Sequence, residues 1–178
     1  MVAVWQKTQV LYWSSVPSPL GECIVMATNE GVCWTGTPGS AVDDGLFRTN
    51  RWFRIDRVVQ GEQVEPLQRA VDELRRYFAG ERVEFSCQLD LRGTPFQLAV
   101  WQELSRIPYG ETRTYGEIAH AIGQLNASRA VGAANGANPV AIIVPCHRVI
   151  GSNGALTGYG GGLSTKAWLL SLEGVKQK

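Results

Sequence analysis

Five consecutive apolar residues at positions 140–144 lead directly into Pro145, Cys146 and His147. A short apolar run of this kind is typical of a buried segment, and we expect it to be extended and strand-like. Residues 151–162 then contain six glycines, which predicts a loop whose backbone can approach another group closely. The chain is therefore expected to deliver a cysteine and a histidine to the edge of a core, beside a glycine-rich loop.

Cys146 can act as a nucleophile only if its proton is removed, because a free thiol has a pKa of about 8.5. Activation requires a nearby base, commonly a histidine oriented by a carboxylate or an amide. Neighbouring side chains of an extended backbone point apart, so His147 would reach Cys146 through a bridging water. Glu173 is the single carboxylate of the last forty residues and could return to His147. By itself, an adjacent Cys–His pair more often marks a cysteine that is simply buried.

The composition is that of a globular chain, with 178 residues of which 44% are hydrophobic. This suffices for one compact domain or for two small ones that share an interface. No stretch approaches the roughly 20 apolar residues of a membrane helix, and residues 1–10 show no secretory signal pattern. We therefore expect a soluble, cytoplasmic protein that does not bind a membrane.

The other three cysteines have no evident chemistry. Cys23 and Cys33 lie in apolar runs and are expected in the core, as free cysteines usually are. A chain of this length does not need disulfides, so the even number of cysteines does not by itself predict any for Cys87 or the others. The two histidines, His120 and His147, form no zinc-ligand spacing with them, and we expect no metal.

The first part of the chain is expected to be a structural α/β domain over residues 1–86, with an antiparallel sheet and a helix. Strand candidates occupy 11–16, 22–27 and 31–35, separated by turn residues. The segment 37–50 is rich in Gly, Asp and Pro and predicts a loop. A helix is expected to begin at Pro66 and to end at Gly80. Residues 87–93 are then expected to link this domain to the second one.

Residues 94–178 predict a mainly helical domain. Thr94 followed by Pro95 is typical of a helix start, and Thr114 with Glu117 forms a capping box. The helix that starts at Thr114 and the segment 128–135 are joined by a short link containing Gly123, which makes them a helix-turn-helix candidate. The alternative is plain packing of two helices, which is the more common case. Ser164 is expected to cap the last helix, and Gly174 to end it.

The charge distribution adds a weak indication of a polyanionic partner. The net charge of +1 divides into 10 Lys/Arg against 12 Asp/Glu over residues 1–92, and 7 against 4 over residues 93–178. A mildly basic half can meet nucleic acid. Ordinary scatter of charge explains the same numbers.

A resemblance to a known family makes these indications specific. Residues 145–150 (Pro-Cys-His-Arg-Val-Ile) resemble the active-site motif of the O6-alkylguanine-DNA alkyltransferases. The segment 128–139 resembles the family's recognition helix and the asparagine after it, 157–163 resembles its substrate-pocket loop, and 166–173 resembles its closing helix. The similarity is dense from about 94 to 174 and faint over the first 85 residues, where only the turn at 18–21 is suggestive.

The resemblance implies a stoichiometric transfer of an alkyl group from O6-alkylguanine in double-stranded DNA, with O4-alkylthymine as a further candidate. Cys146 would accept the alkyl group as a stable thioether, so each molecule would act once. His147 would deprotonate it through water, Glu173 would hold His147, and Asn138 would brace the turn. Tyr115 would donate the proton that the leaving guanine needs, although from its sequence alone it could equally pack on the next turn of its helix.

The resemblance also implies how DNA is bound. The nucleotide must be extruded from the stack, and Arg129 would fill the gap, or else contact phosphate as an ordinary surface arginine. The small side chains of this helix suit a sequence-tolerant minor-groove mode. The expected DNA-contacting residues besides Arg129 are Thr114, Ser128, Ala130, Ala133 and Ala134. The expected pocket residues are Trp101, Pro145, Val149, Tyr159 and Gly160.

Two departures and three rival interpretations accompany this expectation. Gly160 stands where relatives often carry alanine or serine, so the pocket is expected to admit larger alkyl groups. Some relatives hold zinc in the N-terminal half, and the lack of a histidine before His120 excludes that site here. The rivals are a binding module that recognises damage without reacting, a cysteine hydrolase, and a thiol-based redox or structural protein. Cys146 argues against the first rival, and counting turnovers separates the second.

The family implies a ribonuclease H-like first domain, and we expect a monomer without cofactors, associated with the nucleoid if the source is prokaryotic.

Overall fold

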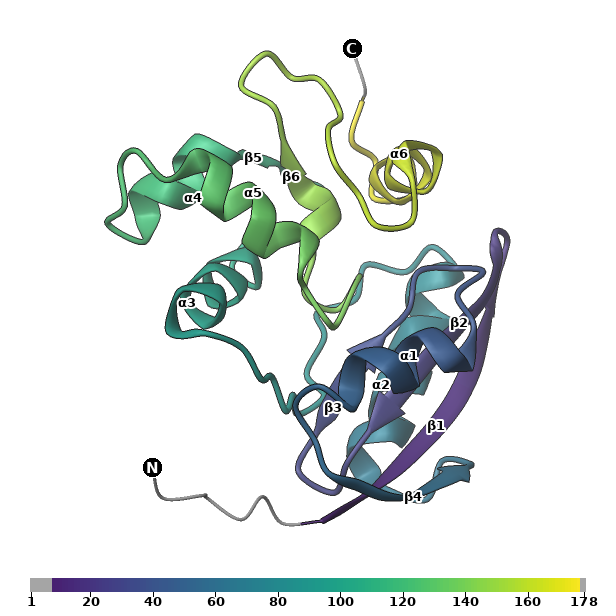
Figure 1. Ribbon diagram of the computed structural model, residues 1–178. Coiled ribbons are helices and arrows are strands. Elements are labelled where there is room, and N and C mark those ends of the chain that lie inside the picture. Colours follow the sequence, from purple (N-terminus) through teal and green to yellow (C-terminus); the bar gives the residue numbers. More distant parts are fainter. Residues whose placement is uncertain (1–7, 177–178) are drawn as a thin grey trace, which may run out of the picture.

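The computed structural model describes residues 8–176 and contains a sheet region followed by a helical region (Figure 1). Most of the N-terminal stretch in which no signal pattern was found, residues 1–7, lies outside the described part, as do residues 177–178. None of the helices within 8–176 is long and apolar enough to cross a membrane.

The sheet region contains the three expected strands and a fourth that sequence reasoning missed. β1 (Gln9–Ser18), β2 (Gly21–Ala27) and β3 (Val32–Thr35) pair antiparallel, as predicted. β4 (Ile55–Gln60) pairs parallel with β1, so the sheet is mixed, in the order β3-β2-β1-β4, and the expectation of a purely antiparallel sheet was wrong in this respect. β4 is an edge strand with mostly exposed side chains, and for that reason it lacks a clear apolar pattern.

The loop predicted over 37–50 was wrong, because α1 (Val42–Thr49) forms there. Asp44 accepts a hydrogen bond from the backbone N–H of Ala41 at 3.0 Å and so satisfies one donor of the helix start. Gly45, which suggested a loop, lies inside the helix. A Cβ at Gly45 would fall 2.5 Å from Met26 and 2.6 Å from Trp34, so the glycine allows the helix to approach the sheet closely.

The two helices of this region cover opposite faces of the sheet. Along β2, Cys23 and Val25 join the cluster that contains α2 (Glu65–Phe78), whereas Ile24 and Met26 join the cluster against α1. This alternation follows from the period of two in a β-strand. The predicted helix after Pro66 is confirmed, and Gly80 follows its end with a φ of 89°.

The helical region confirms the predicted starts of its first two helices. Thr94 caps α3 (Pro95–Leu104) and Thr114 caps α4 (Tyr115–Ala121), each with a reciprocal capping box. α5 (Ser128–Gly136) packs against both α3 and α4, so α4 and α5 form the expected helix-turn-helix pair.

Residues 140–144 form a tight turn, and the expected extended strand was wrong. The N–H of Val144 donates to the carbonyl of Val140 at 2.9 Å, and Ile142 has a φ of 74°. This conformation is costly for a β-branched residue and persists only where its surroundings impose it. Asn138 is one such constraint, because its side chain accepts from the N–H of Val140 at 3.0 Å and donates to the carbonyl of Val144 at 2.8 Å.

The turn delivers the chain into a single 3-10 turn, η1 (Cys146–Arg148), and then into β6 (Val149–Ile150), which pairs parallel with β5 (Arg113–Thr114). The last helix, α6 (Leu163–Leu172), begins after Gly162, whose φ is 86°. The expected cap by Ser164 was therefore wrong. Gly174 follows the helix end with a φ of 78°, as the predicted stop required.

Candidate active site

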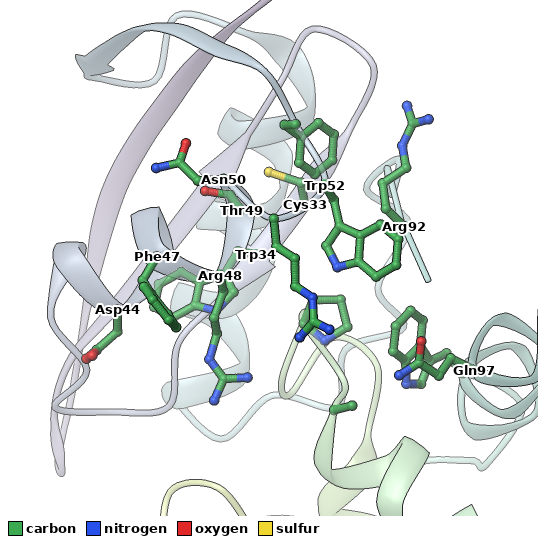
Figure 2. A pocket seen from close by; sticks show the side chains of 15 residues that line it. Cys33, Trp34, Asp44, Phe47, Arg48, Thr49, Asn50, Trp52, Arg92 and Gln97 are labelled. Atoms are coloured by element: carbon green, nitrogen blue, oxygen red, sulfur yellow. The ribbon is translucent and has the colours of Figure 1, made fainter. Parts of the chain in front are cut away.

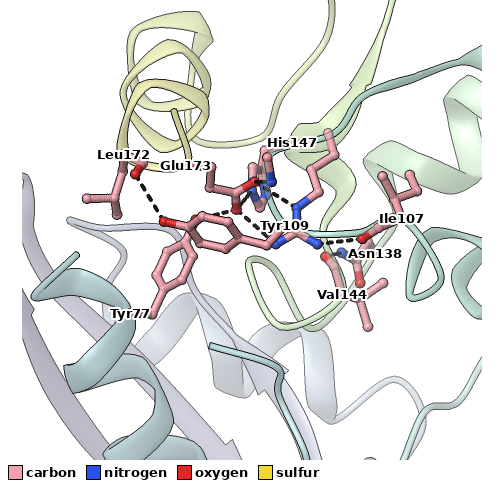
Figure 3. A network of polar contacts seen from close by, with 10 residues as sticks. Tyr77, Ile107, Tyr109, Asn138, Val144, His147, Leu172 and Glu173 are labelled. Carbon is pink, nitrogen blue, oxygen red and sulfur yellow. Dashed lines mark hydrogen bonds and ion pairs between the residues drawn. The ribbon is translucent and has the colours of Figure 1, made fainter. Parts of the chain in front are cut away.

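Glu173 lies at the end of α6 and is the centre of a buried polar network (Figure 3). Its Oε1 lies 2.8 Å from His147 Nε2 and accepts from Arg148 Nη2 at 2.9 Å and from Tyr77 Oη at 2.7 Å. Its Oε2 accepts from Arg148 Nε at 2.9 Å and from the N–H of Gly110 at 3.2 Å. The structure thus brings Glu173 to His147, as expected, and adds Arg148 and Tyr77, which sequence reasoning did not assign.

The electrostatics of this network give a charged glutamate and a neutral histidine. Burial alone would raise the pKa of Glu173, but hydrogen bonds from His147 and Arg148 outweigh it and lower the pKa to about 2. Burial lowers the pKa of His147 and outweighs the opposing effect of Glu173. The ring atom His147 Nδ1 is buried and has no hydrogen-bond partner within residues 8–176. A neutral imidazole anchored at Nε2 with a free Nδ1 can accept a proton there.

Cys146 begins the 3-10 turn and is 5% exposed. Burial raises the pKa of its thiol, while a hydrogen bond with Asn138 and the charge of Lys166 act in the opposite direction. The side chain of Asn135 donates to the carbonyl of Cys146 at 3.3 Å. The thiol is therefore protonated at rest and requires a base before it can react.

A cavity of about 260 Å³ opens onto Cys146. Asn138, Tyr159 and Gly160 line it, and of these Tyr159 and Gly160 were expected in the substrate pocket. The opposite wall comes from the sheet region and was not foreseen; it consists of Trp34, Thr35, Gly36, Thr37, Ser40, Asp44 and Arg48. No local signal marked these residues, because the wall exists only once the two regions pack together.

The glycine loop is shaped by this wall. A Cβ at Gly161 would lie 2.7 Å from the Cβ of Thr37, whereas a Cβ at Gly160 would meet nothing within 4 Å.

Lys166, which sequence reasoning also left without a role, is 0% exposed. It donates to the carbonyls of Val149 and Thr157 and so ties the loop to β6. Burial lowers the pKa of this ammonium to about 8.

A second cavity, of about 780 Å³, lies between α1 and the start of α3 (Figure 2). It is larger, but Cys146 does not line it, so the chemistry is assigned to the smaller cavity. Trp101, which was expected in the substrate pocket, lines this second cavity and donates from its indole to the carbonyl of Ala134 at 2.8 Å. Pro145 and Val149 are buried beside Cys146 but line neither cavity.

The residues expected to meet DNA are only partly accessible. Arg129, Ala130 and Ala133 are exposed on α5, while Ser128 and Thr114 are half-buried. Ala134 is 3% exposed and belongs to the core, so its expected contact with DNA was wrong. The hydroxyl of Tyr115 donates to the carbonyl of Thr157 at 3.2 Å and thus joins the start of α4 to the glycine loop.

The fold and the site together define a class: a protein that carries a helix-turn-helix pair beside a buried cysteine whose histidine and glutamate neighbours are preorganised. Residues 11–91 match the family described as 6-O-methylguanine DNA methyltransferase, ribonuclease-like domain, and residues 95–175 match its DNA binding domain. The chain therefore belongs to the 6-O-methylguanine DNA methyltransferase family, as the motif around Cys146 predicted, and its sheet region is the ribonuclease-like domain.

Individual relatives agree. A methylated-DNA–protein-cysteine methyltransferase of Methanosarcina acetivorans is 46% identical over 168 residues, which cover 92% of this chain and 99% of the relative. That of Mycobacterium tuberculosis is 67% identical over 104 residues, 58% of this chain, and this match spans 63% of the relative's length. The crystal structure of Mycobacterium tuberculosis OGT in complex with DNA superimposes with a TM-score of 0.77 at 46% identity, covering 91% of this chain and 92% of that one.

Proposed function

We propose that this protein repairs DNA by moving the alkyl group of O6-alkylguanine onto Cys146, once per molecule. The observation that carries the proposal is the position of Cys146 at the wall of a cavity, next to a neutral His147 that is anchored through Nε2 to Glu173 and has a free Nδ1. The relatives' name, methylated-DNA–protein-cysteine methyltransferase, refers to methyl transfer from DNA to a protein cysteine and supports the proposal.

The proposed chemistry is one displacement. His147 Nδ1 takes the thiol proton, through a water molecule, and Glu173 stabilises the imidazolium that forms. The thiolate attacks the alkyl carbon, a carbon–sulfur bond forms, and the bond between that carbon and the guanine oxygen breaks with its electrons on the base. The base takes up a proton from the Tyr115 hydroxyl. The resulting thioether is a stable bond, so each protein molecule would act once.

DNA would meet the face of α5 that carries Arg129, Ala130 and Ala133, all of which are exposed. Small side chains allow a helix to approach the minor groove, where sequence is read weakly. Arg129 would fill the gap left by the extruded nucleotide, whose alkylated base then enters the cavity beside Tyr159. Because nothing blocks a Cβ at Gly160, the cavity has room for alkyl groups larger than methyl.

The proposal also covers the domain division, the oligomeric state and the location of the protein. We divide the chain at residues 87–93 into a structural domain of 1–86 and a reactive, DNA-binding domain of 94–178. We propose a monomer that acts in the cytoplasm, at the nucleoid if the source is prokaryotic.

Intact mass after incubation with a duplex containing O6-methylguanine tests the reaction. We expect a gain of about 14 Da, one methylene, located on Cys146 and absent from Cys146→Ala. Restored guanine should not exceed one per protein molecule. Many products per molecule would favour a hydrolase, and unmodified protein with an intact adduct would favour a non-reacting damage binder. Repeating the assay with Gly160→Ser on methyl and benzyl adducts tests the size of the pocket, and unchanged selectivity would count against it.

A further inference from the structure

A tyrosine from the ribonuclease-like domain reaches the network beside Cys146. Tyr77 lies on α2, is 0% exposed and donates from Oη to Glu173 Oε1 at 2.7 Å, across 96 positions of sequence. Its ring is fixed by three aromatic neighbours, with centroid distances of 5.6 Å to Phe78, 5.7 Å to Phe85 and 6.2 Å to Tyr109. The hydroxyl is therefore held on the carboxylate and cannot turn to solvent.

The oxygen that Tyr77 contacts is the one that anchors His147. Oε1 is shared by Tyr77 Oη, His147 Nε2 and Arg148 Nη2, and the whole carboxylate takes five hydrogen bonds although it offers about four lone-pair sites. Donors that share one acceptor compete for its electron density. Tyr77 therefore weakens the hydrogen bond between Oε1 and His147 Nε2, while it fixes the position of that oxygen.

We propose that Tyr77 is a positioning residue for the alkyl transfer, which holds Glu173 Oε1 toward His147 and keeps His147 a neutral base. This inference rests on the proposed function. Burial and the negative charge of Glu173 raise the pKa of Tyr77, so it remains a donor at every pH of interest. The other titratable or charged groups that face His147 and Glu173 are Cys146, Arg148, Lys166 from α6, Tyr109 from the segment after α3, and Tyr159 from the glycine loop.

The sign of the expected effect follows from this competition. Without the Tyr77 hydroxyl, Oε1 accepts more strongly from His147 and stabilises the imidazolium, which raises the pKa of His147. A general base works only in its neutral form. The acid limb of the rate profile should therefore move to higher pH when the hydroxyl is removed.

The test is Tyr77→Phe, which keeps the ring and removes one hydroxyl. Single-turnover rate constants are measured at saturating O6-methylguanine duplex across pH, with the dissociation constant for the same DNA measured separately. We expect a rate loss that grows as the pH falls below about 6, where a pKa rise of roughly 0.7 unit gives at most about fivefold, and that disappears near pH 8. Affinity for DNA should not change, because Tyr77 is a buried residue of α2 and not part of the exposed face of α5.

Tyr109→Phe is the matched control. Its hydroxyl belongs to the same aromatic cluster but donates to the backbone carbonyl of Leu172 at 3.0 Å, not to Glu173. We expect it to keep the wild-type pH profile. A Tyr77→Phe profile identical to the wild type, or a loss that is uniform in pH and matched by Tyr109→Phe, would overturn the inference. A wild-type protein that never gains the alkyl mass would instead refute the proposed function, and circular dichroism confirms that both variants are folded.

Discussion

The two regions of the molecule contribute to the site in different ways. The helical region supplies Cys146, His147 and Glu173, all within 28 consecutive residues, together with the α4–α5 pair. The ribonuclease-like region supplies a wall of the cavity and the hydroxyl of Tyr77. The comparison teaches that the groups proposed to react are local in sequence, whereas some of the residues that surround them come from a distant part of the chain.

The contact between the regions is built into the site itself. The N–H of Thr35 on β3 donates to the carbonyl of Pro139 at 2.9 Å, and the N–H of Ala141 returns to the carbonyl of Thr35 at 3.3 Å. These bonds join the sheet to the strained turn before Cys146. The following predictions separate the contributions of the two regions, in order of decreasing effect.

Glu173→Gln tests whether the helical region holds the indispensable charge. It leaves Arg148 buried and poorly paired, so we expect a loss of about 3–5 kcal/mol in unfolding free energy and of roughly 10²–10⁴-fold in alkyl-transfer rate. Urea denaturation and single-turnover kinetics measure the two losses. Glu103→Gln, which breaks a pair with the exposed Arg106, should cost at most about 1 kcal/mol. Equal costs for the two variants would contradict the assignment.

Acid stability tests the same charge without mutation. The pKa of Glu173 is lowered to about 2 in the folded protein, against about 4.3 in an unfolded chain. Its contribution, on the order of 3 kcal/mol, is present above about pH 4.3 and is lost as the pH falls toward 2. His147, whose pKa is lowered by burial, adds a loss that starts below about pH 6.5. Denaturation midpoints that stay constant down to about pH 3 would show that neither shift exists.

Gly161→Ala tests the wall supplied by the ribonuclease-like region. The added Cβ would lie 2.7 Å from that of Thr37, so the loop must move, at a cost of about 1–3 kcal/mol and with slower transfer. Gly160→Ala meets nothing within 4 Å and is the control for stability, with an expected change near zero in the free energy of unfolding. Thermal unfolding measures the stability of both variants, and single-turnover kinetics measure their transfer rates. An unaffected Gly161→Ala would mean that this wall does not constrain the loop.

Arg129→Ala tests whether DNA binding is confined to the helical region. We expect about tenfold weaker binding to duplex DNA, or roughly 1.4 kcal/mol. Arg57→Ala, on the exposed edge strand β4, removes the same charge from the other region and should leave the affinity unchanged. Fluorescence anisotropy at fixed salt measures both, and a similar loss in Arg57→Ala would extend the DNA surface to the ribonuclease-like region.

Sequence reasoning succeeded where structure is decided by neighbours in the chain. The starts of α3 and α4 depend on a threonine and the side chain three residues later, and the ends of α2 and α6 depend on a following glycine. Cys146 and His147 could be identified from the sequence because they are adjacent within an unusual motif. β4 and α1 were missed because an edge strand lacks an apolar pattern and because Gly45 serves a contact with the sheet.

By itself, the sequence determined the family, the starts of α3, α4 and α5, and the adjacency of Cys146 and His147. Only the tertiary structure decided that residues 140–144 turn with Ile142 at a φ of 74°, that Ala134 faces the core, and that Tyr77 binds Glu173. The physical reason is that caps, prolines and glycines act over three or four residues, whereas burial and the sharing of one carboxylate oxygen exist only after distant segments have packed.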